Sequence, residues 1–324
     1  MLYNKEQVSN ILNFSKKIYL WRSGGIGDVF MFLPILNFLI KSYKKTKFQL
    51  LTGVDIDFFK NSRVKKYITS DKIVYEKKPN FLGLNDSFVP LNSIHFGVKD
   101  NHQIDNYFDY FNLNPSNKDK RIDLLFNFPK KSPLENEQKI VTIHASNGDV
   151  NRTWPKKNYL KLINELLSKN FIINLIGKSS NFDGNFKGLH NFKNLNINDY
   201  SNKLSPHETM LLINRSDLFI STDTGPVQLA IATNTPIICI YSVIKGNNRL
   251  SFNKSSFSNS ITGKCDHYGC FHSKLSSEFL NVNGGDSLSD FCFLQENKYS
   301  CLIDIKPNRI LEEVYSFFNK TNSI

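Results

Sequence analysis

The stretch LFISTDTGPVQLAIA, residues 218–232, begins as a short apolar run, breaks at Asp223 and re-forms as a run of small and apolar residues typical of a helix. Pro226 suits the first helical position, where its missing N–H costs nothing, and Thr224 or Gly225 can cap the helix. A strand that turns directly into a helix is a unit of a parallel sheet. The stretch therefore predicts an α/β fold.

The turn in this stretch is also a candidate ligand site. A helix that begins here directs N–H groups and the positive end of its dipole outward, which attracts anions. Asp223 comes at the carboxyl end of the preceding strand, where open α/β sheets bind their ligands. Two interpretations of Asp223 stay open: it caps a turn, or it binds sugar hydroxyls while the helix start holds a phosphate.

Strands and helices alternate in the same way along the N-terminal part of the chain. Apolar runs predict strands at 17–22, 48–51 and 72–75, and a glycine turn at 24–27 leads into a helix over 28–43. Such alternation implies parallel βαβ units.

A polar, proline-containing stretch at 128–138 predicts a linker, after which the alternation restarts. The predicted elements of the second part are strands at 139–144, 171–176, 218–220 and 236–241, helices at 156–167 and from Pro206, an irregular region at 247–298 and a helix at 305–318. We therefore expect two Rossmann-like domains that face a central cleft, at 1–130 and 138–304. The remaining segment, 305–324, carries the last helix, which we consider as packing back toward the N-terminal domain.

Composition restricts the classes of partner. The chain has 324 residues, of which 40% are hydrophobic, enough for two cores. Its net charge of +12 favours anionic partners such as nucleotides, phosphorylated glycans or an acidic membrane surface. The lysines are scattered and form no compact basic arm, so nucleic acid is not an expected partner.

The sequence also bears on location. The first twenty residues carry no apolar core of a secretory signal, and no apolar run is long enough to span a bilayer. Five cysteines, an odd number, argue for a reducing compartment and against a disulfide framework. We expect a cytoplasmic protein, with peripheral contact to the inner face of a membrane.

The first segment with candidate chemistry is RSGGIGD, residues 22–28. Glycines between a strand and a helix, among them Gly25 and Gly27, let a ligand approach the backbone closely. The spacing does not fit a dinucleotide fingerprint, and no acidic residue closes the next strand. Asp28 stands at the helix start, where the dipole favours its ionised form and it can accept a proton from a hydroxyl. The alternative is that Asp28 only caps the helix.

The second segment is HASNGDVNRTWP, residues 144–155. Here a strand runs into a polar loop with one arginine. Arg152 can offer a fork of donors to a diphosphate, and Ser146 and Asn147 can add hydrogen bonds. The alternative is a surface loop with a solvated arginine. His144 is interpreted as a satisfied histidine at a strand end rather than as a base.

Four of the cysteines lie in or just after the irregular region. The spacing of Cys265, Cys270, Cys292 and Cys301 is loose for a zinc module, so two interpretations stay open: a structural metal site, or loosely packed thiols. Cys239 lies inside a predicted strand and belongs to a core.

Taken together, these segments resemble glycosyltransferase family 9, the heptosyltransferase-like enzymes. In that family a Gly-Asp pair follows the first strand, as at 27–28, with a proline several residues on, as at Pro34. A basic residue before Trp-Pro matches RTWP at 152–155. The signature Asp-Ser/Thr-Gly-Pro-x-His-Leu-Ala, followed by Thr-Pro, matches DTGPVQLA at 223–230 and TP at 235–236. The motifs occur in the right order along nearly the whole chain.

The resemblance implies a GT-B architecture, with the acceptor bound by the N-terminal half and a nucleotide-sugar donor by the C-terminal half. It implies metal-independent, inverting transfer, without a required cofactor, of a heptose from ADP-heptose to a lipopolysaccharide or other surface glycan. Asp28 would be the general base, and Asp223 would orient the donor sugar. The diphosphate would be bound by Arg152, Thr224 and Gly225.

One residue departs from the family pattern. Gln228 stands where the family usually has His, and glutamine can hydrogen-bond but carries no charge. Three alternatives therefore remain open: another nucleotide-sugar donor, a protein acceptor, or a non-catalytic protein that binds nucleotides or glycans.

Overall fold

The structure is a computed structural model that describes residues 3–22, 24–70, 86–91, 101–129, 138–145, 149–177, 196–253, 257–272, 292–294 and 296–321. The chain divides into two compact units. Unit 1 contains residues 1–129 and 251–253, and unit 2 contains residues 130–250 and 254–324. The predicted strand at 72–75 lies outside the described residues.

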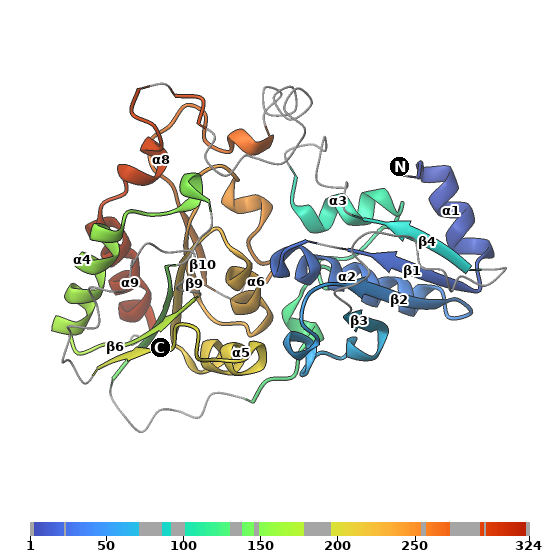
Figure 1. Ribbon diagram of the computed structural model, residues 1–324, viewed down its shortest axis with the longest axis horizontal. Coiled ribbons are helices and arrows are strands. Elements are labelled where there is room, and N and C mark those ends of the chain that lie inside the picture. Colours follow the sequence, from blue (N-terminus) through green and yellow to red (C-terminus); the bar gives the residue numbers. More distant parts are fainter. Residues whose placement is uncertain are drawn as a thin grey trace. The chain divides into compact units, whose positions relative to one another are not determined.

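Unit 1 is built around a parallel sheet with the strand order β3-β2-β1-β4 (Figure 1). Its elements are α1 (Lys5–Phe14), β1 (Lys17–Trp21), α2 (Ile26–Ser42), β2 (Lys47–Thr52), η1 (Ile56–Phe59), η2 (Lys65–Tyr67), β3 (Ile68–Ser70), β4 (Asp86–Pro90), α3 (Gln103–Tyr110) and η5 (Asp123–Leu125). The predicted strand–turn–helix at the start of the chain is therefore present, although the helix begins at Ile26 and not at Asp28.

Helix α2 forms the centre of the unit 1 core because most of its side chains are apolar and many of them are buried. Phe30 stacks on Phe126 with ring centroids 5.4 Å apart, and Phe32 meets Tyr107 of α3 edge-on at 5.1 Å. Aromatic pairs of this kind add to the burial of apolar area. The packing fixes the N-terminus of α2, with Asp28 in its first turn.

Unit 2 has a six-stranded parallel sheet with the order β10-β9-β8-β5-β6-β7. Its elements are β5 (Ile140–His144), η6 (Val150–Arg152), α4 (Lys156–Ser168), β6 (Ile172–Ile176), β7 (Ile197–Asp199), α5 (Pro206–Arg215), β8 (Leu218–Thr222), α6 (Gly225–Ala232), β9 (Ile237–Ile240), η9 (Gly246–Asn248), β10 (Ser258–Ile261), η10 (Cys270–His272), α8 (Ser300–Ile303) and α9 (Pro307–Thr321). Strand β10 lies in the region that the sequence indicated as irregular, because SNSI is too polar to predict a strand.

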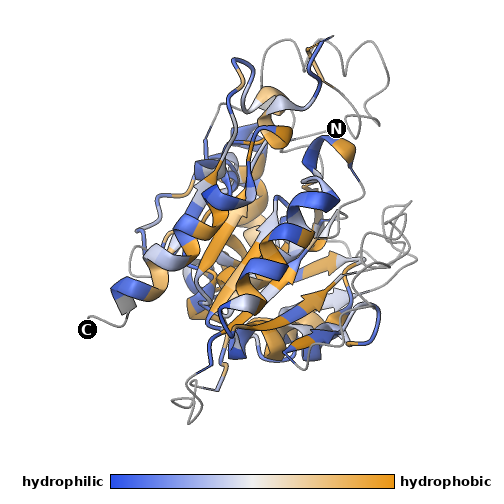
Figure 2. Cartoon of the chain, turned by 90° about the vertical axis from the view of Figure 1, so that its left-hand side faces the viewer, coloured by the Kyte–Doolittle hydropathy of each residue, from blue (hydrophilic) through white to orange (hydrophobic). Residues whose placement is uncertain are grey.

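Helices cover both faces of this sheet, with α4 and α9 on one face and α5 and α6 on the other (Figure 1). The strands of the molecule are coloured mainly as hydrophobic, while helices expose hydrophilic residues on their outer sides (Figure 2). This is the pattern expected when parallel strands are buried on both faces.

The last helix, α9, is part of unit 2. Phe318 packs on Phe171 with centroids 5.2 Å apart, and Trp154 Nε1 donates a hydrogen bond to the carbonyl of Ile305 at 2.9 Å. The apolar face of α9 thus completes the core of unit 2. An amphipathic helix packs where an apolar sheet face is open, and here that face belongs to unit 2.

Each sheet has one point at which the strand order reverses. In unit 1 it lies between β1 and β4, and in unit 2 between β5 and β8. Ligands of open α/β sheets bind outside the carboxyl ends of strands at such switch points. The loops after β1, β5 and β8 are therefore the positions where functional side chains are expected. Within the described residues, no helix is both long and apolar enough to cross a bilayer.

Candidate functional site

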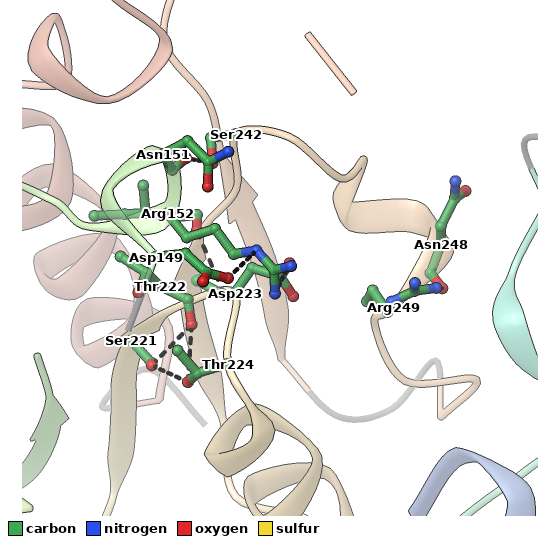
Figure 3. A network of polar contacts seen from close by, with 12 residues as sticks. Asp149, Asn151, Arg152, Ser221, Thr222, Asp223, Thr224, Ser242, Asn248 and Arg249 are labelled. Atoms are coloured by element: carbon green, nitrogen blue, oxygen red, sulfur yellow. Dashed lines mark hydrogen bonds and ion pairs between the residues drawn. The ribbon is translucent and has the colours of Figure 1, made fainter. Parts of the chain in front are cut away.

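Arg152 and Asp223 meet at the switch point of unit 2. Arg152 ends the short η6 turn after β5, and Asp223 directly follows β8. Arg152 Nη1 lies 3.8 Å from Asp223 Oδ2, and Nε lies 3.3 Å from Asp149 Oδ2, so that the guanidinium lies between two carboxylates (Figure 3). The longer of these distances is within ion-pair range but beyond a hydrogen bond. The structure thus brings together two of the predicted donor-site residues.

The loop that carries Arg152 is fixed by hydrogen bonds to its own backbone and to a neighbouring strand. Thr153 Oγ1 donates to the carbonyl of Asp149 at 2.7 Å, and Ser242 Oγ donates to the carbonyl of Asn151 at 2.6 Å. Ser242 follows β9, so the bond joins the loops after β5 and β9 (Figure 3). Asp149 is a contact of Arg152 that the sequence analysis missed.

Thr224 is the N-cap of α6, and Gly225 is its first residue, so Pro226 takes the second helical position. The Thr224 hydroxyl makes no capping bond to the helix. Its Oγ1 instead lies 3.1 Å from Ser221 Oγ and 3.3 Å from His144 Nδ1. The side chain of Thr224 is therefore held toward the end of β5.

His144 is buried at the end of β5, and this burial lowers its pKa to about 4. The ring is therefore neutral near pH 7, and its Nδ1 also lies 3.3 Å from Ser221 Oγ. This environment agrees with the interpretation of His144 as a satisfied histidine at a strand end. A neutral, enclosed imidazole supports the Thr224 turn.

Gln228 lies one turn into α6 and is 3% exposed. Its Nε2 donates to the main-chain carbonyl of Arg249 at 2.9 Å, which ties α6 to the turn after η9. Its Oε1 is buried and has no hydrogen-bond partner in the described part of the chain. Arg249 is itself buried, with Nη1 donating to the carbonyl of Asn248 at 3.1 Å (Figure 3). Gln228 is therefore bonded to the main chain of a buried arginine.

Asp28 lies at the switch point of unit 1, in the first turn of α2. The N-cap of α2 is Gly25, with no side-chain bond, and Gly27 is the second helical residue, so Asp28 does not cap the helix. Its Oδ1 lies 3.3 Å from Nη2 of Arg22, the residue after β1. Arg22 Nε in turn donates to the hydroxyl of Tyr107 at 2.9 Å. Burial raises the pKa of Tyr107, and the charge of Arg22 acts in the opposite direction.

The four cysteines of the predicted metal site influence one another. Burial, and then the thiols of Cys265, Cys270 and Cys292, raise the pKa of Cys301 to about 12. Burial, followed by Cys292 and Cys265, raises the pKa of Cys270 to about 11. All four lie among the described residues, in which no group of three or more His, Cys, Asp or Glu could hold a metal ion. Cys239 is buried in β9, as expected for a core residue.

The structure places these predicted site residues at a switch-point loop or on the helix that follows one: Asp28, Arg152, Asp223, Thr224 and Gln228. Ser146 and Asn147 lie outside the described residues. No role was predicted for Arg22, a buried arginine that lies between an apolar strand and a glycine turn. Arg249 gave no signal, because it follows a stretch without periodicity.

Comparison with protein families gave one match. The profile of glycosyltransferase family 9 (heptosyltransferase) matches residues 92–274, more than half of the chain. This range includes the candidate donor-site residues of unit 2 but not Asp28. A comparison with curated proteins found no match.

Solved structures with a similar fold share little sequence. The iron-containing dodecameric glycosyltransferase TibC from enterotoxigenic Escherichia coli has a TM-score of 0.68 at 13% identity, covering 95% of this chain and 78% of that one. A second TibC structure holds ADP-D-β-D-heptose. A family 9 glycosyl transferase from Veillonella parvula has a TM-score of 0.63 at 10% identity, covering 97% and 99%. Escherichia coli heptosyltransferase WaaC with ADP scores 0.57 at 12%, covering 95% and 100%. The shared architecture is GT-B.

Proposed function

The chain belongs to glycosyltransferase family 9, and from this premise we propose that it transfers a heptose from ADP-heptose to a hydroxyl of lipopolysaccharide or another surface glycan. The similar structures that hold ADP or ADP-heptose support this donor. The net charge of +12 supports an anionic acceptor and peripheral contact with an anionic membrane surface, on the cytoplasmic side.

The convergence of Arg152 and Asp223 at the switch point of unit 2 carries the proposal. Arg152 binds the diphosphate of the donor, and Asp223 accepts hydrogen bonds from the sugar. Asp149 and Asp223 offset the Arg152 charge in the structure, so the diphosphate competes with both carboxylates for the guanidinium. The start of α6, at Thr224 and Gly225, adds about half a positive charge from the helix dipole.

In the proposed reaction Asp28 is the general base. Its carboxylate takes the proton of the acceptor hydroxyl while the hydroxyl oxygen bonds to the anomeric carbon of the heptose. The bond from that carbon to the diphosphate breaks, and ADP leaves with both bonding electrons. Attack from the face opposite the diphosphate inverts the anomeric centre. Arg152 and the start of α6 stabilise the charge of the leaving group, and the proposal requires no metal for this step.

Nucleotide binding tests the donor side. ADP, GDP and UDP are added separately to the full chain, and the shift in melting temperature is measured. We expect ADP to give the largest shift and Arg152→Ala to abolish it. Arg215→Ala, which removes an exposed arginine from α5 in the same unit, is the matched control and keeps the shift. If no nucleotide stabilises the protein, the donor assignment fails and a scaffold or glycan-binding role is favoured. A larger shift with GDP or UDP indicates another donor sugar, the alternative that Gln228 raises.

Transfer kinetics test the base. With ADP-heptose as donor and heptose-deficient lipopolysaccharide as acceptor, Asp28→Ala is expected to lower kcat by roughly 100- to 10,000-fold, the usual contribution of a positioned base. Donor binding, measured by the ADP-induced thermal shift, is expected to stay intact. A kcat within about tenfold of wild type contradicts the role of Asp28.

A further inference from the structure

Arg22 is a buried cation that the proposed transfer chemistry does not use. Its side chain is 3% exposed, and a guanidinium at that depth requires charged and hydrogen-bonded partners. Two of these partners are Tyr107, which accepts a hydrogen bond from Nε at 2.9 Å, and Asp28, whose Oδ1 lies 3.3 Å from Nη2. The guanidinium therefore links helix α3 to the carboxylate on α2.

Tyr107 gives Arg22 a rigid support. The tyrosine is fully buried, and its ring meets Phe32 edge-on at 5.1 Å. Phe32 lies one turn after Asp28 on α2. The packing of α2 against α3 thus fixes both partners of Arg22, Tyr107 on α3 and Asp28 on α2.

The two side chains of the Arg22–Asp28 pair differ in exposure. The Asp28 side chain is 27% exposed, whereas that of Arg22 is 3% exposed. The backbone at Gly24 passes beside both groups: a Cβ there would lie 3.0 Å from Arg22 Nη1 and 3.1 Å from Asp28 Oδ2. The glycine leaves space that the two side chains fill, which restricts the rotation of the carboxylate.

We propose that Arg22 is a positioning residue for Asp28: held by Tyr107, it binds one carboxylate oxygen and fixes the direction in which the carboxylate meets the acceptor hydroxyl. The inference rests on the proposed role of Asp28 as base. A base must lie within hydrogen-bond reach of the proton it takes, and a misplacement of about 1 Å can cost roughly 100-fold in rate.

A double-mutant cycle in the full chain tests the proposal, with ADP release from ADP-heptose measured in the presence of heptose-deficient lipopolysaccharide. Arg22→Gln is expected to lower kcat about 10- to 100-fold while KM for ADP-heptose stays within about twofold. In an Asp28→Asn background the same change is expected to cause no further loss. Arg22→Lys, which keeps the charge, is expected to recover part of kcat.

Two further variants complete the design. Lys120→Gln is the control expected to keep the wild-type kcat. It removes the ion pair between Lys120 Nζ and Oδ1 of Asp105 (2.6 Å), a residue that lies on α3 together with Tyr107. If Arg22→Gln does not fold, Tyr107→Phe carries the test, because it removes one oxygen and is expected to lower kcat by about three- to tenfold.

The outcomes separate the two roles. A wild-type kcat in Arg22→Gln or in Tyr107→Phe, or an equal loss in both backgrounds, overturns the positioning role while Asp28 remains the base. Full activity of Asp28→Asn overturns the base assignment itself, and the role of Arg22 with it.

Discussion

Gly24 has a φ of +130°, a conformation that side-chain-bearing residues rarely adopt, and it lies against Arg22 and Asp28. We expect Gly24→Ala to lower kcat for transfer by about tenfold or more, because the new methyl group displaces the ion pair and strains the turn. Gly25→Ala is the comparison: Gly25 has a φ of −65°, and its added Cβ would lie 3.8 Å from Asp28 Oδ2, an ordinary contact. If the two variants retain equal activity, the turn does not depend on Gly24.

The buried, neutral His144 makes the stability of unit 2 depend on pH. Burial lowers its pKa from 6.5 to about 4, so between these values the unfolded chain binds a proton that the folded chain does not. Stability is therefore full above about pH 6.5 and falls as the pH falls toward 4, by on the order of 3 kcal/mol in total.

His144→Asn removes this titration and keeps polar atoms beside Thr224 and Ser221. We expect urea unfolding to show a smaller loss of stability between pH 7 and pH 4.5 for the variant than for wild type. Equal losses would mean that His144 is not the titrating group.

At the scale of elements, the apolar runs of the sequence predicted β1, β5, β6, β8 and β9, because buried parallel strands have continuous apolar sequences. Strand β10 was missed because its polar sequence pairs at a sheet edge through backbone bonds alone. The candidate site likewise contains residues that the sequence predicted and residues that it did not. Asp28, Arg152 and Asp223 could be predicted because each lies in the loop or first helical turn that follows a strand. The contacts of Arg22 with Tyr107 and of Arg249 with Gln228 could not, because they join residues that are 85 and 21 positions apart.

Helix α9 is expected to stabilise unit 2 through its aromatic residues. Phe318 is 7% exposed and packs on Phe171, so Phe318→Ala is expected to lower the free energy of unfolding of unit 2 by about 3 kcal/mol. Phe14→Ala is the control, because Phe14 is 80% exposed and surface substitutions change stability by less than about 0.5 kcal/mol. Denaturant unfolding measures both. A small effect at Phe318 would mean that α9 contributes little to the core.

At the scale of the whole molecule, two compact units imply that unfolding need not be a single transition. We expect ADP, at about 100 times its Kd, to raise the free energy of unfolding of unit 2 by about 2.7 kcal/mol and to leave that of unit 1 unchanged. Calorimetry measures the two unfolding transitions. Arg152→Ala removes the effect. A shift confined to unit 1 would place the nucleotide site in the other half of the chain.

The position of α9 in the core of unit 2 has a consequence for synthesis. Strand β5 begins at Ile140, but the apolar surface beneath α9 is covered only after Phe318 has been added. A ribosome that has translated every residue of the candidate donor site therefore still carries an unfinished domain. Until the helix emerges, the nascent chain presents an open apolar face, the kind of surface that chaperones bind and that drives aggregation.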